Sequence, residues 1–260
     1  MPQEKTITTA YSPGFQPIGS VSSLTNNLAQ LAKKRLNGVL YFYWGHYDYH
    51  YEDIAPIFRK NADGKYIHLE KEDHIFRELL RRCPDDFSTC TTIFERLVKM
   101  QHYSLPTRLL DITSNPLVAL YFACKKTEAE NGKDEDGALI IYEVNENKIH
   151  YFDDNKVCLL SNIALLPFDA PLKRNQWGFN QIVKQAKSEN HDFFMKDSML
   201  NDVLCVMPKL DNPRIIRQSG AFFLFGCDKK KSKPATLSIP KYKIQIKNRR
   251  KKKILSELDS

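Results

Sequence analysis

The sequence predicts an α+β fold in a single domain. Helical patterns lie mainly in the N-terminal half, and the strand patterns that would form a mixed sheet lie mainly in the later half. That order differs from the regular alternation of strands and helices in a parallel α/β fold. The 260 residues, of which 42% are hydrophobic and 27% charged, are sufficient to bury a sizeable core.

The first elements are an extended lead-in, one helix and one strand. Residues 1–20 contain a Pro-Gly pair and few apolar side chains, which is typical of an extended segment. Apolar residues at helical spacing then predict a helix over 22–34. An Asn-Gly turn leads into an aromatic strand over 39–43, which we expect to end at Gly45.

Three more helices are predicted before residue 125. The first covers 70–82 and is broken by a Cys-Pro pair, and the second covers about 91–102. The third begins at Asn115-Pro116, because Asn is a good N-cap and Pro suits the first helical position. Its residues to Cys124 are apolar on nearly all sides, so we expect a buried helix.

In the second half of the chain, the residue patterns predict mostly strands. Residues 159–166 fit either a strand or a short helix, and the polar stretch 172–200 fits no element clearly. Strands are expected at 138–144, 203–207 and 221–225, with an edge strand at 242–246.

The net charge of +8 has a local origin. Residues 229–253 contain 12 Lys or Arg and no acid, whereas the rest of the chain is mildly acidic. We expect a basic C-terminal strand and the start of a helix over 229–260. This segment could bind nucleic-acid phosphates, or its lysines could merely protect an edge strand, and the sequence leaves both interpretations open.

The composition also indicates a cytoplasmic protein without a membrane partner. No apolar run approaches the roughly 18 residues of a transmembrane helix, and the first residues lack the apolar core of a signal peptide. The six cysteines form no C-x-x-C pair and fit no common zinc spacing, so we expect reduced thiols and no metal.

Polar side chains gather between two of the predicted helices, in residues 100–116. Gln101, His102, Arg108 and Asp111 could converge there if the segment folds back as a loop. Arg108 and Asp111 could form an ion pair, which would serve either a functional site or the shape of the loop.

Two other segments could contribute to a site. Gln218 lies at the mouth of the buried strand predicted at 221–225, and its amide can both donate and accept hydrogen bonds. Residues 46–51 alternate Tyr with His and Asp, which fits either a site or a surface loop of amphipathic rings.

These segments carry a family resemblance. Residues 100–124, M-Q-H-Y-S-L-P-T-R-L-L-D-I-T-S-N-P-L-V-A-L-Y-F-A-C, resemble the core signature of the bacterial FRG domain. Residues 212–223, N-P-R-I-I-R-Q-S-G-A-F-F, resemble that family's second signature. The likeness extends from about residue 22 to 258, which implies a domain core over 21–228.

The resemblance departs at the Phe-Arg-Gly motif that names the family. The matching stretch is Phe42-Tyr43-Trp44-Gly45-His46, which keeps the glycine and has Trp44 in place of the arginine. A guanidinium can bind a phosphate through two hydrogen bonds, and an indole cannot.

The resemblance implies a bacterial effector or accessory protein of phage defence or of a mobile element. The family pattern is also similar to that of ADP-ribosyltransferases, and this similarity implies an NAD-using enzyme. The catalytic residues would then be Gln101, His102, Arg108, Asp111 and Gln218. The NAD-binding residues would be Tyr43, Gly45, His46 and Arg59. The alternative is a non-catalytic module that binds a small molecule or a protein partner.

Overall fold

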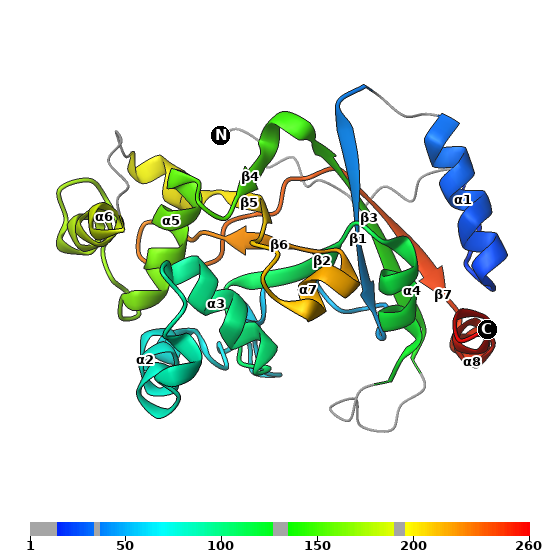
Figure 1. Cartoon of the computed structure of the whole chain (residues 1–260), viewed down its shortest axis with the longest axis horizontal. Helices are drawn as coiled ribbons and strands as arrows, with labels where there is room; N and C mark the ends of the chain where they lie inside the picture. The colour runs from blue at the N-terminus through cyan, green and yellow to red at the C-terminus, as the bar shows by residue number, and fades with distance from the viewer. Residues whose placement is uncertain (1–14, 34–36, 127–134, 190–195) are drawn as a thin grey trace. The chain divides into compact units, whose positions relative to one another are not determined.

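The computed structural model describes residues 15–33, 37–126, 135–189 and 196–260, so residues 1–14 of the expected lead-in lie outside it. Within these ranges it shows eight α-helices and a seven-stranded mixed sheet, which confirms the α+β class (Figure 1). The strand order is β4-β5-β6-β2-β1-β3-β7. Most strands follow residue 136, as predicted, but helices also occur throughout the second half.

The chain divides into two compact units, each built from separate stretches of sequence. Unit 1 comprises Met1–Glu52, Ile112–Asn147 and Ile239–Ser260, and unit 2 comprises Asp53–Asp111 and Lys148–Ser238. All five candidate catalytic residues therefore belong to unit 2, whereas Tyr43, Gly45 and His46 belong to unit 1.

The strands of unit 1 form an antiparallel ladder. β1 (Val39–His46) pairs with β3 (Gly137–Asn145), and β3 pairs with β7 (Lys241–Ile246). β7 ends the strand order, which confirms the predicted edge strand. Lysines that point outward from such a strand discourage pairing with other chains.

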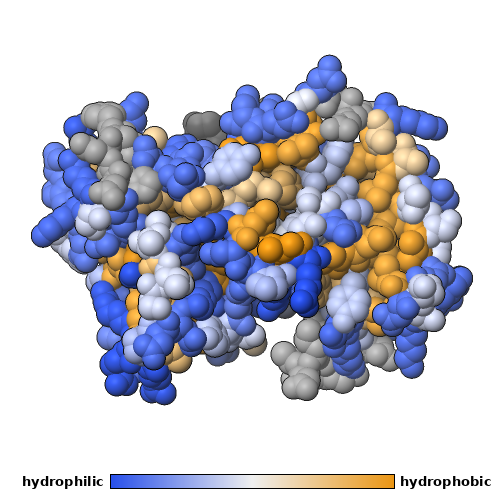
Figure 2. All heavy atoms as spheres, viewed as in Figure 1, coloured by the Kyte–Doolittle hydropathy of each residue, from blue (hydrophilic) through white to orange (hydrophobic). Residues whose placement is uncertain are grey.

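Three helices belong to unit 1: α1 (Val21–Lys33), α4 (Pro116–Cys124) and α8 (Asn248–Leu258). The side chain of Asn115 caps α4 by accepting a hydrogen bond from the Leu117 amide at 3.0 Å, as predicted. The expected full burial of α4 is wrong, because Leu117 and Phe122 are 43% and 37% exposed. Figure 2 shows hydrophobic side chains at the surface in the part of the chain that holds α4.

Unit 2 contains the two central helices that the sequence predicted, α2 (Glu72–Arg82) and α3 (Ile93–His102). The Thr92 hydroxyl accepts a hydrogen bond from the Glu95 amide at 3.2 Å, and the Glu95 side chain bonds back to the start of the helix. This capping box fixes where α3 begins, and therefore where its last residues, Gln101 and His102, are placed.

The later helices of unit 2 resolve the ambiguous segments. Residues 159–166 are helical, in α5 (Asn155–Ser161) and the short 3₁₀ helix that follows. The unassigned stretch contains α6 (Trp177–Ser188). The last α-helix described in unit 2, α7 (Pro213–Gln218), begins at the N-cap Asn212.

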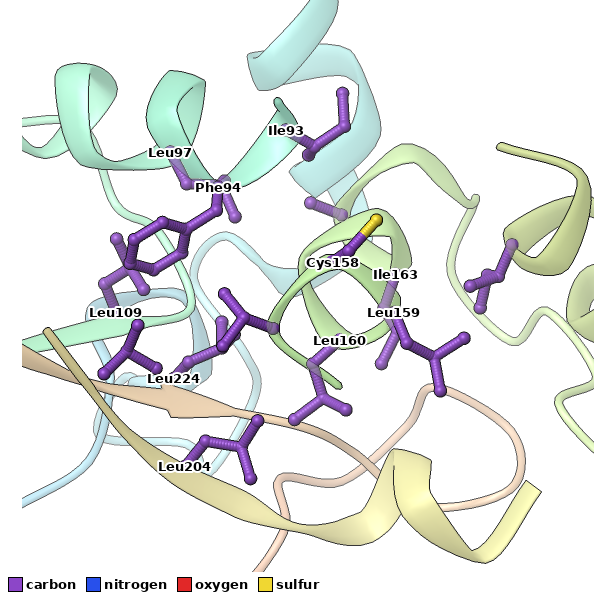
Figure 3. Close-up of a cluster of buried hydrophobic side chains, with 14 of the residues drawn as sticks. Ile93, Phe94, Leu97, Leu109, Cys158, Leu159, Leu160, Ile163, Leu204 and Leu224 are labelled. Carbon is purple, nitrogen blue, oxygen red and sulfur yellow. The ribbon is translucent and has the colours of Figure 1, made fainter. Parts of the chain in front are cut away.

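The remaining strands of unit 2 are short. β4 (Ile149–Tyr151) runs parallel to β5 (Val203–Met207), and β5 runs antiparallel to β6 (Gly220–Phe225). Side chains of α3 and α5 pack with Leu204 and Leu224 of these strands in the core of unit 2 (Figure 3).

Residues 109–113 were expected to lie in a loop, and they form a strand instead. This strand, β2 (Leu109–Thr113), has buried side chains at four of its five positions. Polar residues on both sides of its apolar run favour a loop when the sequence is considered alone.

Among the described residues, no helix has the length and apolar character to cross a membrane.

Candidate functional site

Six polar residues of unit 2 form a cluster, which we call the polar cluster. It joins the end of α3, the strand β2 and the helix α7. Its members are Gln101, His102, Asp111, Asn212, Arg214 and Gln218. Gln101, His102 and Asp111 meet the second signature segment at Asn212 and Arg214. Gln218 is joined to the cluster through Arg214, whose Nε donates to its Oε1 at 3.4 Å within α7.

Gln101 links α3 to β2. Its Nε2 donates a hydrogen bond to Oδ2 of Asp111 at 2.8 Å, and its Oε1 accepts one from the buried Thr107 hydroxyl at 2.6 Å. With Nε2 directed at the Asp111 carboxyl group and Oε1 at the Thr107 hydroxyl, both ends of the Gln101 amide have a partner. Gln101 therefore holds the Asp111 carboxylate in one position.

His102 links α3 to α7. Its Nδ1 lies 2.9 Å from Nδ2 of Asn212, whose own Oδ1 accepts a hydrogen bond from the Arg214 amide at 2.8 Å. The Asn212 oxygen is thus engaged as the helix cap, and its NH₂ group can donate to the ring. A neutral His102 then carries its proton on Nε2.

The titratable members of the cluster have shifted pKa values. Burial lowers the pKa of His102, and the nearby charge of Arg214 adds to that shift. Asp111 has solvent-accessible surface, yet the protein atoms packed around its carboxyl group raise its pKa, against the opposing effects of Gln101 and Arg214. The lowered pKa of His102 and the raised pKa of Asp111 both favour the neutral form of the side chain. Titratable groups with shifted pKa values are common at functional sites.

A surface hollow of about 370 Å³ adjoins the cluster at His102 and Asn212. Its volume is within the range of small-molecule sites. Phe94, Val98 and Pro208 give it an apolar part, and its charged residues include two lysines and two acids. The charged residues are Glu95, Lys99, Lys209 and Asp211.

Arg108 lies outside the polar cluster, and the expected pair with Asp111 does not form. Its side chain is fully buried and binds both carboxylate oxygens of Glu72, at 2.9 and 2.6 Å. Arg108 and Asp111 are three residues apart in extended chain, so their side chains leave on opposite faces. This geometry supports a structural role for Arg108.

The Arg108–Glu72 pair is part of a larger buried network. Lys231 is also fully buried, and its Nζ lies 3.0 Å from Oε2 of Glu72 and donates to the carbonyl of Leu166. Arg108 additionally donates to the carbonyl of Phe225 at 2.9 Å. Burial disfavours the Glu72 carboxylate, but Arg108 and Lys231 outweigh it and hold the pKa of Glu72 below its usual value.

The residues proposed to hold NAD in unit 1 have other roles in the structure. Tyr43 is buried in the core of unit 1, and burial raises its pKa. A Cβ on Gly45 would lie 1.7 Å from the carbonyl oxygen of Ala119, so the glycine allows α4 to approach β1 closely. These placements support packing roles for both residues.

His46 and Arg59 have more accessible side chains. His46 stacks on Tyr51 with 3.9 Å between ring centroids, and the Asp48 amide donates to its Nδ1 at 3.0 Å. Arg59 follows the 3₁₀ helix Pro56–Phe58 of unit 2 and contributes, after burial, to the lowered pKa of His68. Trp44, which stands where the family has arginine, is only 8% exposed.

The comparisons with known proteins agree with the first signature. Residues 40–132 match the family model of the FRG domain, which is consistent with an FRG-domain protein. The match includes the whole core signature but neither the second signature nor the full extent from 22 to 258. No curated protein and no solved structure matches the chain.

Sequence reasoning missed four residues that matter here. Asn212 and Arg214 lie in the second signature, and the Asn-Pro pair that starts a helix could have drawn attention to Asn212. Glu72 and Lys231 carried no signal, because one lies in an acidic helix and the other in a basic run where charges are usually exposed.

Proposed function

We propose that the chain is a ligand-binding FRG module whose site is the polar cluster together with the adjacent hollow. The setting in bacterial phage defence is what the family resemblance implies. The observation that carries the proposal is the position of His102, which contacts the second signature through Asn212 and also lines the hollow.

The chemistry of the site favours a ligand with a flat ring and hydrogen-bonding edges, such as a nucleoside or nucleotide. Phe94, Val98 and Pro208 line the hollow as its apolar part, although each side chain is largely buried in unit 2. The Nε2 proton of His102 and the carboxyl group of Asp111 provide a donor and an acceptor. Sites for small molecules combine apolar surface with a few placed polar groups, and the polar groups form the larger share of this hollow.

An NAD-using ADP-ribosyltransferase is the second candidate. The shifted pKa values of His102 and Asp111 favour it, because they would suit acid–base chemistry. The burial of Arg108 and the presence of Trp44 weigh against it, since neither position offers an accessible guanidinium for a diphosphate. The binding module is therefore the better supported function.

The test is calorimetric titration of the full chain with adenosine, AMP, ADP-ribose and NAD. We expect at least one of them to bind, and His102→Leu to weaken that binding at least about tenfold, equivalent to ~1.4 kcal/mol. Tyr103→Phe is the control, because Tyr103 is on the same turn but bonds to Asp86 outside the hollow.

Incubation with NAD separates the two candidates. A binding module leaves NAD intact, whereas release of nicotinamide that is lost in Asp111→Asn would establish the enzyme. If none of the four compounds binds in the millimolar range, or if His102→Leu binds as well as the parent, the proposed site is wrong.

A further inference from the structure

A basic and aromatic surface of unit 1 shares no residue with the polar cluster. It consists of the segment 46–51, the end of β7 and the exposed face of α8. We call this the unit 1 basic surface. It contains the run of Tyr and His that the sequence singled out, together with the second half of the basic segment 229–253.

One aspartate holds the parts of this surface together. The side chain of Asp136 accepts hydrogen bonds from Lys247 Nζ at 2.9 Å and from the Asn248 amide at 2.8 Å. Its backbone carbonyl accepts one from the Tyr49 amide at 2.6 Å. The aromatic segment and the start of α8 are therefore joined through a single residue.

Lysines contact the aromatic rings of the segment. Lys243 Nζ lies 4.5 Å from the centre of the Tyr49 ring. Lys251 is buried, lies over the Tyr47 ring and donates to the Tyr47 carbonyl at 2.6 Å. Lys251 therefore holds α8 against the segment 46–51, whereas the neighbouring basic side chains of the helix are exposed.

Three of the four exposed bases of α8 lie on one face of the helix, and Arg250 lies to the side of it. Arg249, Lys252 and Lys253 are all exposed and are spaced three and four residues apart, so they lie on the same side. The side opposite them is buried through Lys251 and Ile254. Within the described ranges, Lys253 is the base of this face that pairs with an acid, Glu257, at 3.6 Å.

The fold itself does not require these bases. Edge protection accounts for lysines on β7, but α8 is not a strand. Positive charges at the start of a helix also oppose its dipole and are slightly unfavourable. Their position is better explained by an external anionic partner.

We propose that the unit 1 basic surface binds single-stranded nucleic acid. The face of α8 would contact phosphates, and Tyr49 and His50, which is exposed, would offer rings for unpaired bases. Basic grooves combined with aromatic rings are the common means by which proteins bind single strands.

The experiment measures binding of the full chain to fluorescent oligouridylate and oligodeoxythymidylate by polarisation across a salt series. In the triple variant R249Q/K252Q/K253Q, we expect weaker binding and a log–log salt slope reduced by about 2, at roughly 0.7 for each lost phosphate contact. The matched control is K229Q/K230Q/K233Q, which removes three exposed charges of the same basic run in unit 2.

A second variant tests the aromatic part. Tyr49→Leu should weaken binding about tenfold and leave the salt slope unchanged, because a stacked ring carries no charge. Tyr151→Leu is the control, since Tyr151 is an exposed tyrosine of unit 2. Thermal melting of each variant confirms that the fold is intact.

Three results would overturn the proposal. One is that neither oligonucleotide binds at low salt. This result would overturn the proposal even if the protein bound phosphatidylserine vesicles, tested as a second anionic probe. Another is an equal loss in both triple variants, which would show a net-charge effect. The third is equal affinity for duplex and single strands. A preference for RNA or for DNA would identify the natural ligand. None of these outcomes bears on ligand binding at the polar cluster, because the two surfaces share no residue.

Discussion

Arg108 illustrates how one residue can carry a family signature and still be structural. It is the largest fully buried side chain in the described part of the chain, and it is held by Glu72 with Lys231 nearby. Such a network tolerates the loss of a member poorly, because the partner is left as an uncompensated buried charge.

Arg108→Ala is therefore expected to destabilise the protein by about 3–5 kcal/mol. The measurement is the free energy of unfolding in denaturant. Arg81→Ala is the control, because Arg81 is an exposed arginine paired with Glu78 on the surface, and its loss should change stability far less. Equal stability of the two variants would show that the buried network contributes nothing.

Glu72 gives the network a pH dependence. Its pKa is lowered in the folded state, so its stabilising contribution is complete above the usual value of 4.5 and is lost as the pH falls through the lower folded value. We expect the difference in unfolding free energy between the parent and Glu72→Gln to be largest at neutral pH and to shrink below pH 4.5. A difference that grows on acidification would contradict this sign.

At the scale of elements, Gly45 controls how closely α4 packs on β1. A methyl group there would overlap the backbone of α4, which cannot move aside as a side chain could. The motif that names the family keeps this glycine although its arginine is replaced, and the close approach gives a physical reason.

Gly45→Ala should destabilise the protein by about 3 kcal/mol or more, because backbone overlap of this kind exceeds ordinary overpacking. Gly220→Ala is a matched control, since its added methyl group would meet atoms at 3.7 Å, an ordinary contact distance. Thermal melting compares the two. A Gly45→Ala variant that melts with the parent would rule out the packing role.

Trp44→Arg tests whether the family arginine can be restored. Trp44 is 8% exposed on β1, so the substitution would bury a charge in place of an indole. We expect a lower melting temperature and no gain in NAD binding by calorimetry. A variant that is as stable as the parent and binds NAD would return the enzyme to first place.

At the scale of the whole molecule, the sequence predicted the fold class and most elements, because apolar periodicity and caps are local signals. It failed for β2, where polar neighbours concealed a buried strand of five residues. Within the candidate site, Gln101 contacts Asp111, and His102 contacts Asn212 of the second signature segment. Gln218 is joined to them through its helix neighbour Arg214. The partner of Arg108 is 36 residues away and has no local signal. Long-range ion pairs of this kind are determined by tertiary packing.

The basic side chains of residues 229–253 do not form a single group in the structure. Lys231 belongs to the buried network of unit 2, and Lys251 is buried in unit 1. The remaining bases fall into separate exposed groups in the two units, at 229–233 and at 247–253. A run of like charges in a sequence is therefore not one surface in this structure.

The central claim is that His102 is a neutral, ligand-facing residue of the polar cluster. The most direct measurement is a pH titration of the histidine ring nitrogens by long-range ¹H–¹⁵N NMR, with and without the nucleotide that binds most tightly. We predict a pKa for His102 below 6.5, a proton on Nε2 at neutral pH, and a change in its resonances on ligand addition that His150 does not show. A pKa above 6.5, or resonances of His102 that do not move when ligand is bound, would contradict the account.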